Sequence, residues 1–354
     1  MSKRRSLVLL GVLILLLSAF LVACGGSGGT AQQPVEVTRL VEVAGPATEV
    51  EVTRVVEVVA TPAVPVIPFA EEWTNSPHND VTAEAFNHWN EEDPAEVPTE
   101  CAKCHSTPGY RDYVGADGSE VNVVDAPAPI GTTVQCDACH NPATMAKTSV
   151  IFPSGIEITN LGDESRCMEC HQGRASTVSV DQRIADAGLA EDLDTVSADM
   201  GFTNIHYYAA AATQYGTLAK GGYEYAGKSY DGRFDHVASH NTCIECHNPH
   251  TLEVNLEQCQ ACHTDVETAE DLVNIRMAGS LVDYDGDGDM EEGVYYEIEG
   301  LRDLLWQAMM AYSTEKGGAT IGYNEAAYPY FFNDTNGDGT LGEDEAVFDN
   351  AYAT

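Results

Sequence analysis

The sequence predicts a mainly α-helical fold with extensive loops and little sheet. Residues 82–90 form a predicted helix between two prolines, and residues 203–215 form a second predicted helix. Residues 296–312 repeat apolar side chains at helical spacing, which predicts an amphipathic helix near the C-terminus. Stretches that contain proline or glycine lie between these helices and predict loops at residues 107–109, 127–131 and 152–155.

Five copies of the pattern Cys-x-x-Cys-His are the strongest local signal in the chain. They use ten of the eleven cysteines and five of the eleven histidines, whereas chance would give ~0.01 copies at this composition. Two thiols three residues apart can add across the two vinyl groups of a haem, and the following histidine can bind its iron. The residues that we predict to hold five covalently bound haem c groups are Cys101, Cys104, His105, Cys136, Cys139, His140, Cys167, Cys170, His171, Cys243, Cys246, His247, Cys259, Cys262 and His263.

Two other uses of paired cysteines fit this pattern less well. Structural zinc sites need four ligands gathered from two pairs, and an odd number of pairs does not supply them. Disulfide bonds are expected in exported proteins, but they give no reason for a histidine after every second cysteine. Haem attachment explains the thiols and the histidines together, so it is the preferred interpretation.

The five motifs resemble those of the multihaem c-type cytochromes, and the resemblance covers residues 71–265. It implies a pentahaem cytochrome c domain. So many macrocycles leave little room for an apolar core, so we expect the haems themselves to be the core. Each covalent attachment would also hold the chain locally, which makes long connecting loops tolerable.

Each low-spin haem needs a second axial ligand on its distal face. Six histidines lie outside the motifs, so bis-histidine ligation of all five haems is the leading interpretation. His250 follows His247 by three residues and starts on the proximal side of its own haem, so it can reach only a neighbouring iron. The same argument applies to His240, and we expect the spare histidine to be His240 or His88. The candidate distal ligands are His78, His88, His206, His236, His240 and His250.

The N-terminus has the features of an export signal. Three basic residues precede an apolar run at 7–21, which is typical of a secretory signal and too short to favour a membrane-spanning helix. The run ends in Leu-Val-Ala-Cys, which resembles a bacterial lipoprotein box, and this resemblance implies acylation of Cys24. We therefore predict a lipoprotein signal peptide at 1–24 and a lipid anchor on Cys24; an ordinary signal peptide is the alternative.

Residues 25–70 are predicted to form an extended, low-complexity stalk. The segment 35–43 recurs nearly unchanged at 50–58, and its alternation of valine with charged residues favours an extended chain. Three prolines then stiffen the exit toward the folded region. A tether is the preferred role, and self-association through the valine edges is the alternative.

The acidic C-terminal region resembles a pair of EF-hand calcium loops. Residues 334–345 place oxygen ligands at loop positions 1, 3, 5 and 12 and glycine at position 6. An earlier acidic loop matches only the first half of the pattern, because Val294 stands at its position 12 and Glu292 or Glu297 would have to replace it. We therefore predict an EF-hand-like helical domain at 266–354 that binds Ca²⁺. Its candidate ligands are Asp334, Asn336, Asp338, Thr340, Glu345, Asp283, Asp285, Asp287 and Asp289.

The charge of the chain restricts its partners. A formal net charge of −39 disfavours nucleic acid and anionic lipid headgroups, and it is compatible with basic redox partner proteins. The preferred function is a lipid-anchored, extracytoplasmic pentahaem cytochrome that transfers electrons between a membrane redox partner and an external acceptor. Its location would be the bacterial membrane or the cell surface.

Two other functions stay open. One is a multihaem oxidoreductase that acts on nitrite, hydroxylamine or a sulfur oxyanion, which requires an iron with a free distal position. The pentahaem nitrite reductases mark that haem with Cys-x-x-Cys-Lys, which is absent here, so we assign no catalytic residues. The other is a subunit of a cytochrome filament, held by haem-to-haem self-association.

Overall fold

The computed structural model describes most of the chain that follows the predicted stalk. Cys24 and nearly all of the stalk lie outside the described residues, and Val66 and Ile67 at its end are exposed. From Phe69 onward the chain forms one compact unit, and the predicted boundary at residue 266 stays a prediction. In the part of the chain that is described, no helix is long and apolar enough to cross a membrane. The described ranges are 66–189, 194–197 and 200–345.

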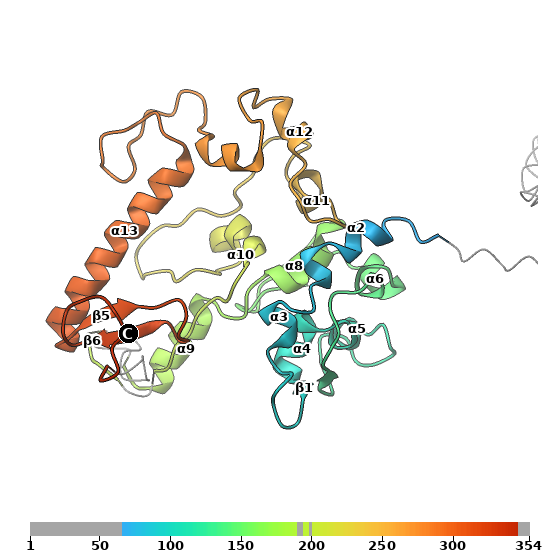
Figure 1. The fold of residues 1–354 in the computed structure, drawn as a ribbon, viewed down its shortest axis with the longest axis horizontal. Coiled ribbons are helices and arrows are strands. Elements are labelled where there is room, and N and C mark those ends of the chain that lie inside the picture. Colours follow the sequence, from blue (N-terminus) through green and yellow to red (C-terminus); the bar gives the residue numbers. More distant parts are fainter. Residues whose placement is uncertain (1–65, 190–193, 198–199, 346–354) are drawn as a thin grey trace, which may run out of the picture. The chain divides into compact units, whose positions relative to one another are not determined.

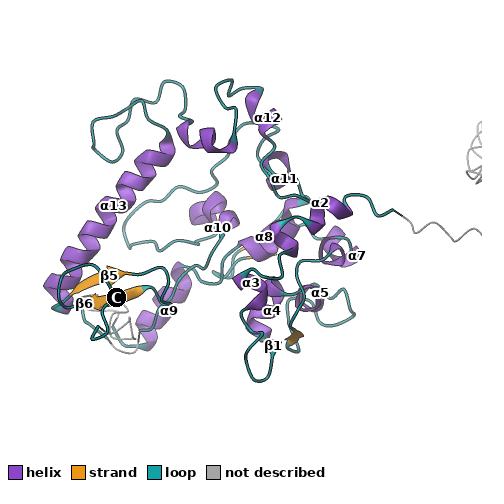
Figure 2. Ribbon diagram, in the orientation of Figure 1, coloured by secondary structure: helices purple, strands orange, loops and turns teal. Residues whose placement is uncertain are grey.

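Short helices joined by loops make up most of the described chain (Figures 1 and 2). Before the third motif the helical segments are α2 (Ala70–Thr74), η1 (Pro77–Asn79), α3 (Glu84–Asn87), α4 (Thr99–His105), α5 (Thr107–Tyr113), α6 (Cys136–Cys139) and α7 (Pro142–Met145). From that motif onward they are α8 (Glu164–His171), α9 (Thr177–Asp186), α10 (Ala210–Tyr215), η2 (Gly216–Leu218), α11 (Cys243–Cys246), α12 (Leu256–Gln260), η3 (Ala269–Asn274), α13 (Val294–Tyr312) and η4 (Ser313–Gly317).

The strands of the described residues form small two-stranded antiparallel sheets (Figure 2). In the longest pair Thr320 lies opposite Asp334, so the second acidic loop starts at the end of a hairpin strand. The small share of sheet agrees with the predicted mainly helical, loop-rich class. The prediction of an EF-hand-like helical domain is wrong at the second acidic loop, because strand β6 and not a helix leads into it. The pairs are β1 (Glu96–Val97) with β2 (Ala128–Pro129), β3 (Val150–Ile151) with β4 (Glu157–Ile158), and β5 (Thr320–Tyr323) with β6 (Phe331–Asp334).

The loop predicted at 107–109 is wrong, because these residues begin helix α5. Proline is tolerated in the first turn of a helix, where its missing N–H has no intrahelical partner. Ser106 caps this end, since its Oγ accepts a hydrogen bond from the backbone N–H of Gly109 at 3.0 Å. Position 109 also requires glycine sterically, because a Cβ on Gly109 would lie 2.4 Å from the carbonyl oxygen of Ala102.

The three predicted helices form with different lengths. The amphipathic segment becomes α13, which begins two residues before the predicted start. The helix predicted at 82–90 is reduced to α3, and the one predicted at 203–215 to α10. His206 and Tyr208 take left-handed backbone conformations, with φ of 83° and 51°, so the chain cannot be helical before α10.

The described core consists of three apolar clusters, and each contains one residue that lies between the two cysteines of a haem motif. Ala102 and Met168 are 0% exposed and Ala138 is 3% exposed. Burial of this residue between the two cysteines fixes the orientation of the helical turn that carries them. The clusters are Val97, Ala102 and Ala128; Tyr110, Val114 and Ala138; and Val150, Phe152, Leu161, Met168, Ala211, Ala212, Tyr215 and Ala219.

Candidate haem-binding sites

In four of the Cys-x-x-Cys-His motifs both cysteines lie on one short helix and project from the same side of its turn, while in the fifth Cys259 lies on α12 and Cys262 lies in the turn that follows. The ten cysteines of the motifs are free thiols, which stand in for the thioether sulfurs of a haem-loaded protein. In the second, fourth and fifth motifs the histidine backbone N–H bonds the carbonyl of the first cysteine at 2.8 Å. The motif helices in chain order are α4, α6, α8, α11 and α12.

Three motif histidines are held by a backbone carbonyl. The Nδ1 atoms of His105 and His171 lie 2.8 Å from the carbonyl oxygens of Ala85 and Tyr208, and His247 Nδ1 lies 3.0 Å from a third carbonyl. A carbonyl oxygen only accepts, so Nδ1 must carry the proton and Nε2 keeps its lone pair. This is the tautomer and orientation that an iron ligand needs.

Four of the candidate distal histidines face a motif histidine ring. A metal–imidazole bond is about 2 Å long and the ring nitrogen lies about 1.1 Å from the ring centre, so two rings on one iron have centres roughly 6 Å apart. The observed distances between the ring centres are close to this value. The pairs are His78 with His171 at 6.4 Å, His206 with His105 at 5.9 Å, His250 with His140 at 6.2 Å, and His236 with His263 at 6.0 Å.

The charge state of two of these histidines suits iron binding. Burial, and then the neighbouring His171, lowers the pKa of His78 to about 4. Burial, followed by Arg174 and His105, lowers the pKa of His206 to about 4. Both rings are therefore neutral near pH 7 and have a lone pair to donate. Neutral rings of this kind fit an iron ligand. The buried Nδ1 of His206 has no hydrogen-bond partner in the described structure.

Two of the candidate distal ligands do not face a motif histidine among the described residues. His88 is half exposed, bonds Glu84 Oε1 through its Nδ1 at 2.7 Å, and lies edge-on to Trp89. His240 has Ser239 Oγ 3.5 Å from its Nδ1. The sequence predicted one spare histidine, either His88 or His240, and the described structure pairs neither, so it brings together four pairs where five were expected.

The motifs contact one another through side chains. Cys170 of the third motif donates to the carbonyl oxygen of Lys103 in the first at 3.8 Å, and Cys243 of the fourth packs against the apolar cluster that contains Met168 of the third. In addition, Lys103 Nζ lies 3.2 Å from Glu169 Oε1. The third motif therefore lies directly between the first and the fourth.

A fully buried carboxylate strengthens the link between the first and third motifs. Glu169 is 0% exposed and accepts from Gln172 Nε2 at 2.9 Å. Its second oxygen lies 2.9 Å from Lys147 Nζ, so two lysines neutralise one buried charge. A buried ion pair of this kind is costly to break, because either partner left alone is an uncompensated charge.

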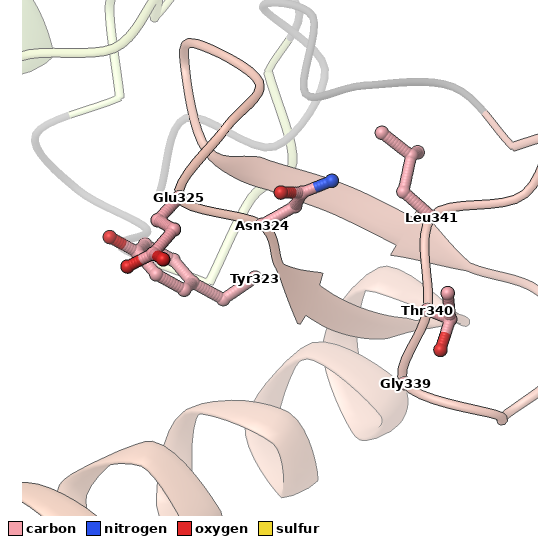
Figure 3. Close-up of a pocket in the computed structure, with 6 residues that line it drawn as sticks. All are labelled: Tyr323, Asn324, Glu325, Gly339, Thr340 and Leu341. Atoms are coloured by element: carbon pink, nitrogen blue, oxygen red, sulfur yellow. The ribbon is translucent and has the colours of Figure 1, made fainter.

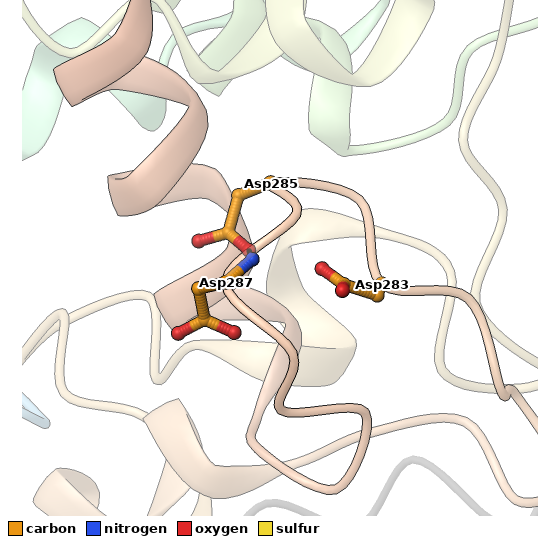
Figure 4. Close-up of side chains that lie close together, drawn as sticks. All are labelled: Asp283, Asp285 and Asp287. Carbon is orange, nitrogen blue, oxygen red and sulfur yellow. Dashed lines mark hydrogen bonds between the residues drawn. The ribbon is translucent and has the colours of Figure 1, made fainter.

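The two acidic loops share one pattern of backbone hydrogen bonds. In the first loop Asp283 accepts from the N–H groups of Gly286 and Gly288 at 2.6 and 3.1 Å. In the second loop Asp334 accepts from Gly337 and Gly339 at 2.7 and 3.0 Å. Both loops thus turn back over the carboxylate at position 1. Figure 4 shows the first loop, where carboxylate oxygens of Asp283, Asp285 and Asp287 lie within 4.8 Å of one another.

The loops differ in the residue that closes them. Glu345, at position 12 of the second loop, accepts from the N–H groups of Thr335 and Asn336 at 2.8 and 3.3 Å. In the first loop the same two positions donate to Glu297, from Tyr284 at 2.7 Å and Asp285 at 3.2 Å. Glu297, in the first turn of α13, therefore closes the first loop by the same backbone hydrogen bonds, and its Oε1 also forms an ion pair with Arg276 at 2.6 Å.

Glu292, the other replacement that the sequence allowed, does not have this role. Its Oε1 is buried without a hydrogen-bond partner in the described structure. It nevertheless lies near the loop, because its carboxylate, that of Asp285 and that of Glu297 come within 4.8 Å of one another. Burial and three aspartates and a glutamate nearby raise the pKa of Glu292.

A pocket lies beside the second loop (Figure 3). Residues that follow strand β5 line one part of it, and Gly339, Thr340 and Leu341 of the loop line the other. Glu325 is its one carboxylate, so the lining does not resemble a catalytic centre. The remaining lining residues are Tyr323 and Asn324.

Comparison with known proteins places part of the chain among c-type cytochromes. Residues 84–185, which contain the first three motifs, match the family of cytochrome c7 and related cytochrome c. The C-type polyheme cytochrome OmcC of Geobacter sulfurreducens is 24% identical over 323 residues, which covers 77% of this chain and 38% of that protein. The C-type polyheme cytochrome OmcB of the same species is 25% identical over 341 residues, which covers 77% and 40%.

The chain thus spans less than half the length of these relatives. No solved structure matches it significantly. The family match and the two relatives agree with the attachment motifs in the chemistry that they imply, which is haem held by thioether bonds. These findings support a multihaem c-type cytochrome with covalently bound haem c.

Proposed function

We propose that this chain is a lipid-anchored, extracytoplasmic pentahaem cytochrome that transfers electrons between a membrane redox partner and an external acceptor. The observation that carries the proposal is the set of four histidine pairs with ring centres 5.9–6.4 Å apart. An iron held between two histidines changes oxidation state without exchanging a ligand, which suits electron transfer rather than substrate chemistry.

The contacts between motifs support a continuous path for electrons. The third motif contacts the first through Cys170 and Glu169, and Cys243 of the fourth packs against the cluster around Met168. His250, which follows the fourth motif, faces His140 of the second. Haems attached in this way would lie near one another, as electron transfer between them requires.

Substitution of His250 tests the ligand assignment. In the haem-loaded protein, His250→Ala should leave five haems attached and add about one fifth of the iron to the high-spin fraction of the wild type, because the haem at Cys136 and Cys139 loses its distal ligand. Electron paramagnetic resonance of the oxidised protein measures this fraction. His250→Met should restore the sixth ligand of this haem and raise its reduction potential.

The control for this experiment is His88→Ala, since His88 is half exposed and faces no motif histidine in the described residues. It should leave the spectrum unchanged. In a variant that also carries Cys136→Ala and Cys139→Ala, His250→Ala should have no further effect. A further increase in the high-spin signal on adding His250→Ala to this background would contradict the assignment of His250 to the second haem.

The lipid anchor has its own test, because Cys24 lies outside the described residues. Cys24→Ser should release the cytochrome from the membrane fraction while the haem content stays at five. Intact mass of detergent-extracted protein should give two or more acyl chains on a mature N-terminus at Cys24. A different N-terminus would contradict the anchor without affecting the electron-transfer proposal.

We further propose that the two acidic loops bind Ca²⁺ and that the ions stabilise the C-terminal region. The specific observation is their matched hydrogen-bond pattern, in which Glu345 and Glu297 have the same role. An ion that binds only the folded state stabilises it by about 2.7 kcal/mol at a free concentration one hundred times its Kd. Chelation should therefore lower the melting temperature of this region and leave the haem spectrum unchanged.

Variants of the closing glutamates refine this test. Glu345→Gln should weaken calcium binding roughly tenfold at one site, as read by isothermal titration calorimetry. Glu297→Gln should weaken the other site, and Glu292→Gln should have the smaller effect. Glu325→Gln, which lies near the second loop but outside it, is the matched control. Equal calcium binding by all four variants would contradict the proposal.

A further inference from the structure

Four of the five motifs have a facing histidine, and the fourth motif is the exception. The rings that face the third, first, fifth and second motif histidines are those of His78, His206, His236 and His250. Among the described residues, no histidine ring faces His247 in this way. Only His88 and His240 are left as candidates for a second histidine ligand there.

His88 belongs to the surroundings of the first motif. Its Nδ1 bonds Glu84, its ring lies edge-on to Trp89, and the Trp89 ring packs against His105 at 5.3 Å. His105 already has His206 as its facing ring. His88 is therefore held away from the fourth motif by contacts that a haem on His105 would not remove.

His240 is close to the fourth motif in sequence but lies at the opposite end of its helix. Glu245 Oε2 accepts from the backbone N–H groups of Asn241 and Thr242 at 2.9 Å each, which fixes this segment at the N-terminal end of α11. His247 follows the C-terminal end of α11, where its Nδ1 bonds the carbonyl of Leu252. The same helix therefore separates the two histidines.

The fourth motif is also accessible from solvent. Helix α11 buries no side chain, and His247 is exposed. Both features expose this motif to solvent, so we expect a small molecule to reach a haem held there. The formal net charge of −39 lowers the local concentration of anions, so uncharged molecules would reach it more readily than nitrite or sulfite.

We propose that the haem attached at Cys243 and Cys246 has His247 as its only histidine ligand and binds a small uncharged molecule on the opposite face of its iron. Ligands of this class include carbon monoxide and nitric oxide. The inference rests on the proposed pentahaem cytochrome. It gives one haem of the electron path a second property, namely that its spin state and potential respond to a dissolved gas.

Titration of the reduced, full-length haem-loaded protein with carbon monoxide tests this inference. We expect one carbon monoxide per five haems, and high-spin iron in about one fifth of the haems of the oxidised protein. His240→Ala and His88→Ala should each still bind one equivalent. His78→Ala, which opens the third haem, should bind two.

The outcomes separate this inference from the function on which it rests. Fewer than five haems by intact mass would contradict the pentahaem proposal itself. Five low-spin haems that bind no carbon monoxide would overturn only the open position. If wild type binds none and His240→Ala binds one equivalent, His240 is the sixth ligand and the inference is wrong. Loss of the carbon monoxide site in Cys243→Ala/Cys246→Ala, with four haems retained, would locate it on the fourth haem.

Discussion

The third and fourth motifs read Cys-Met-Glu-Cys-His and Cys-Ile-Glu-Cys-His, so they differ at one position only. The two residues between the cysteines nevertheless have different surroundings in the two motifs. Met168 is 0% exposed inside the largest apolar cluster, whereas Ile244 is 39% exposed. Glu169 is fully buried between two lysines, whereas Glu245 accepts from the backbone N–H groups that precede its own helix.

This difference separates what the motif determines from what its surroundings determine. The cysteines and the histidine set the attachment chemistry, and they are the same in both cases. The surrounding residues decide whether the polypeptide or the haem holds the motif in place. The third motif is packed by the protein itself, whereas Ile244 of the fourth is exposed, so we expect the fourth to depend more on its covalent haem. The family match ends at residue 185, so it includes the third motif but not the fourth.

Removal of the buried charge should give the largest effect. Glu169→Gln leaves Lys103 and Lys147 without their shared partner, so the free energy of unfolding should fall by roughly 3–5 kcal/mol. Glu245→Gln keeps an oxygen that accepts the same backbone hydrogen bonds and should change stability little. Denaturant unfolding of both haem-loaded variants, followed by far-ultraviolet circular dichroism, measures the two values. If both variants lose the same free energy of unfolding, the proposed difference between the third and fourth motifs is wrong.

Truncation of the apolar residue should give the next effect. Met168→Ala should cost about 3 kcal/mol, because a fully buried side chain is lost and a cavity remains beside Phe152 and Tyr215. Ile244→Ala removes a side chain that is partly in water already and should cost below about 1 kcal/mol. The same unfolding measurement compares them. A large loss for Ile244→Ala would mean that its side chain packs on the fourth haem, and the comparison would then need to include that contact.

Part of the molecule could be predicted from local patterns. The motifs, the mainly helical class and the amphipathic helix α13 depend on residues that are close in sequence. The burial of Met168 and the exposure of Ile244 do not, because each depends on segments far along the chain. The loop predicted at 107–109 failed for a local reason: proline in a first helical turn, capped by Ser106, was read as a helix breaker.

The histidine pairs and the loop closure needed three-dimensional information. Sequence reasoning supplied six histidines for five haems, but only the fold brings His78 next to His171, 93 positions later. In the first acidic loop the pattern expects a glutamate at position 12. Glu297 stands at position 15, and the turn that begins α13 brings it to the same backbone N–H groups. Spacing alone left Glu292 equally acceptable.

The smallest expected effect concerns the helix start at the fourth motif. Glu245→Ala removes the acceptor for the N–H groups of Asn241 and Thr242, which are two of the donors that a helix leaves unpaired at its N-terminus. The melting temperature should fall by less than in Glu169→Gln or Met168→Ala, because water can replace the carboxylate at this partly exposed site. Differential scanning calorimetry of Glu245→Ala and Glu245→Gln gives the comparison. If the two variants melt alike and below wild type, the negative charge rather than the hydrogen bonds would be what stabilises α11.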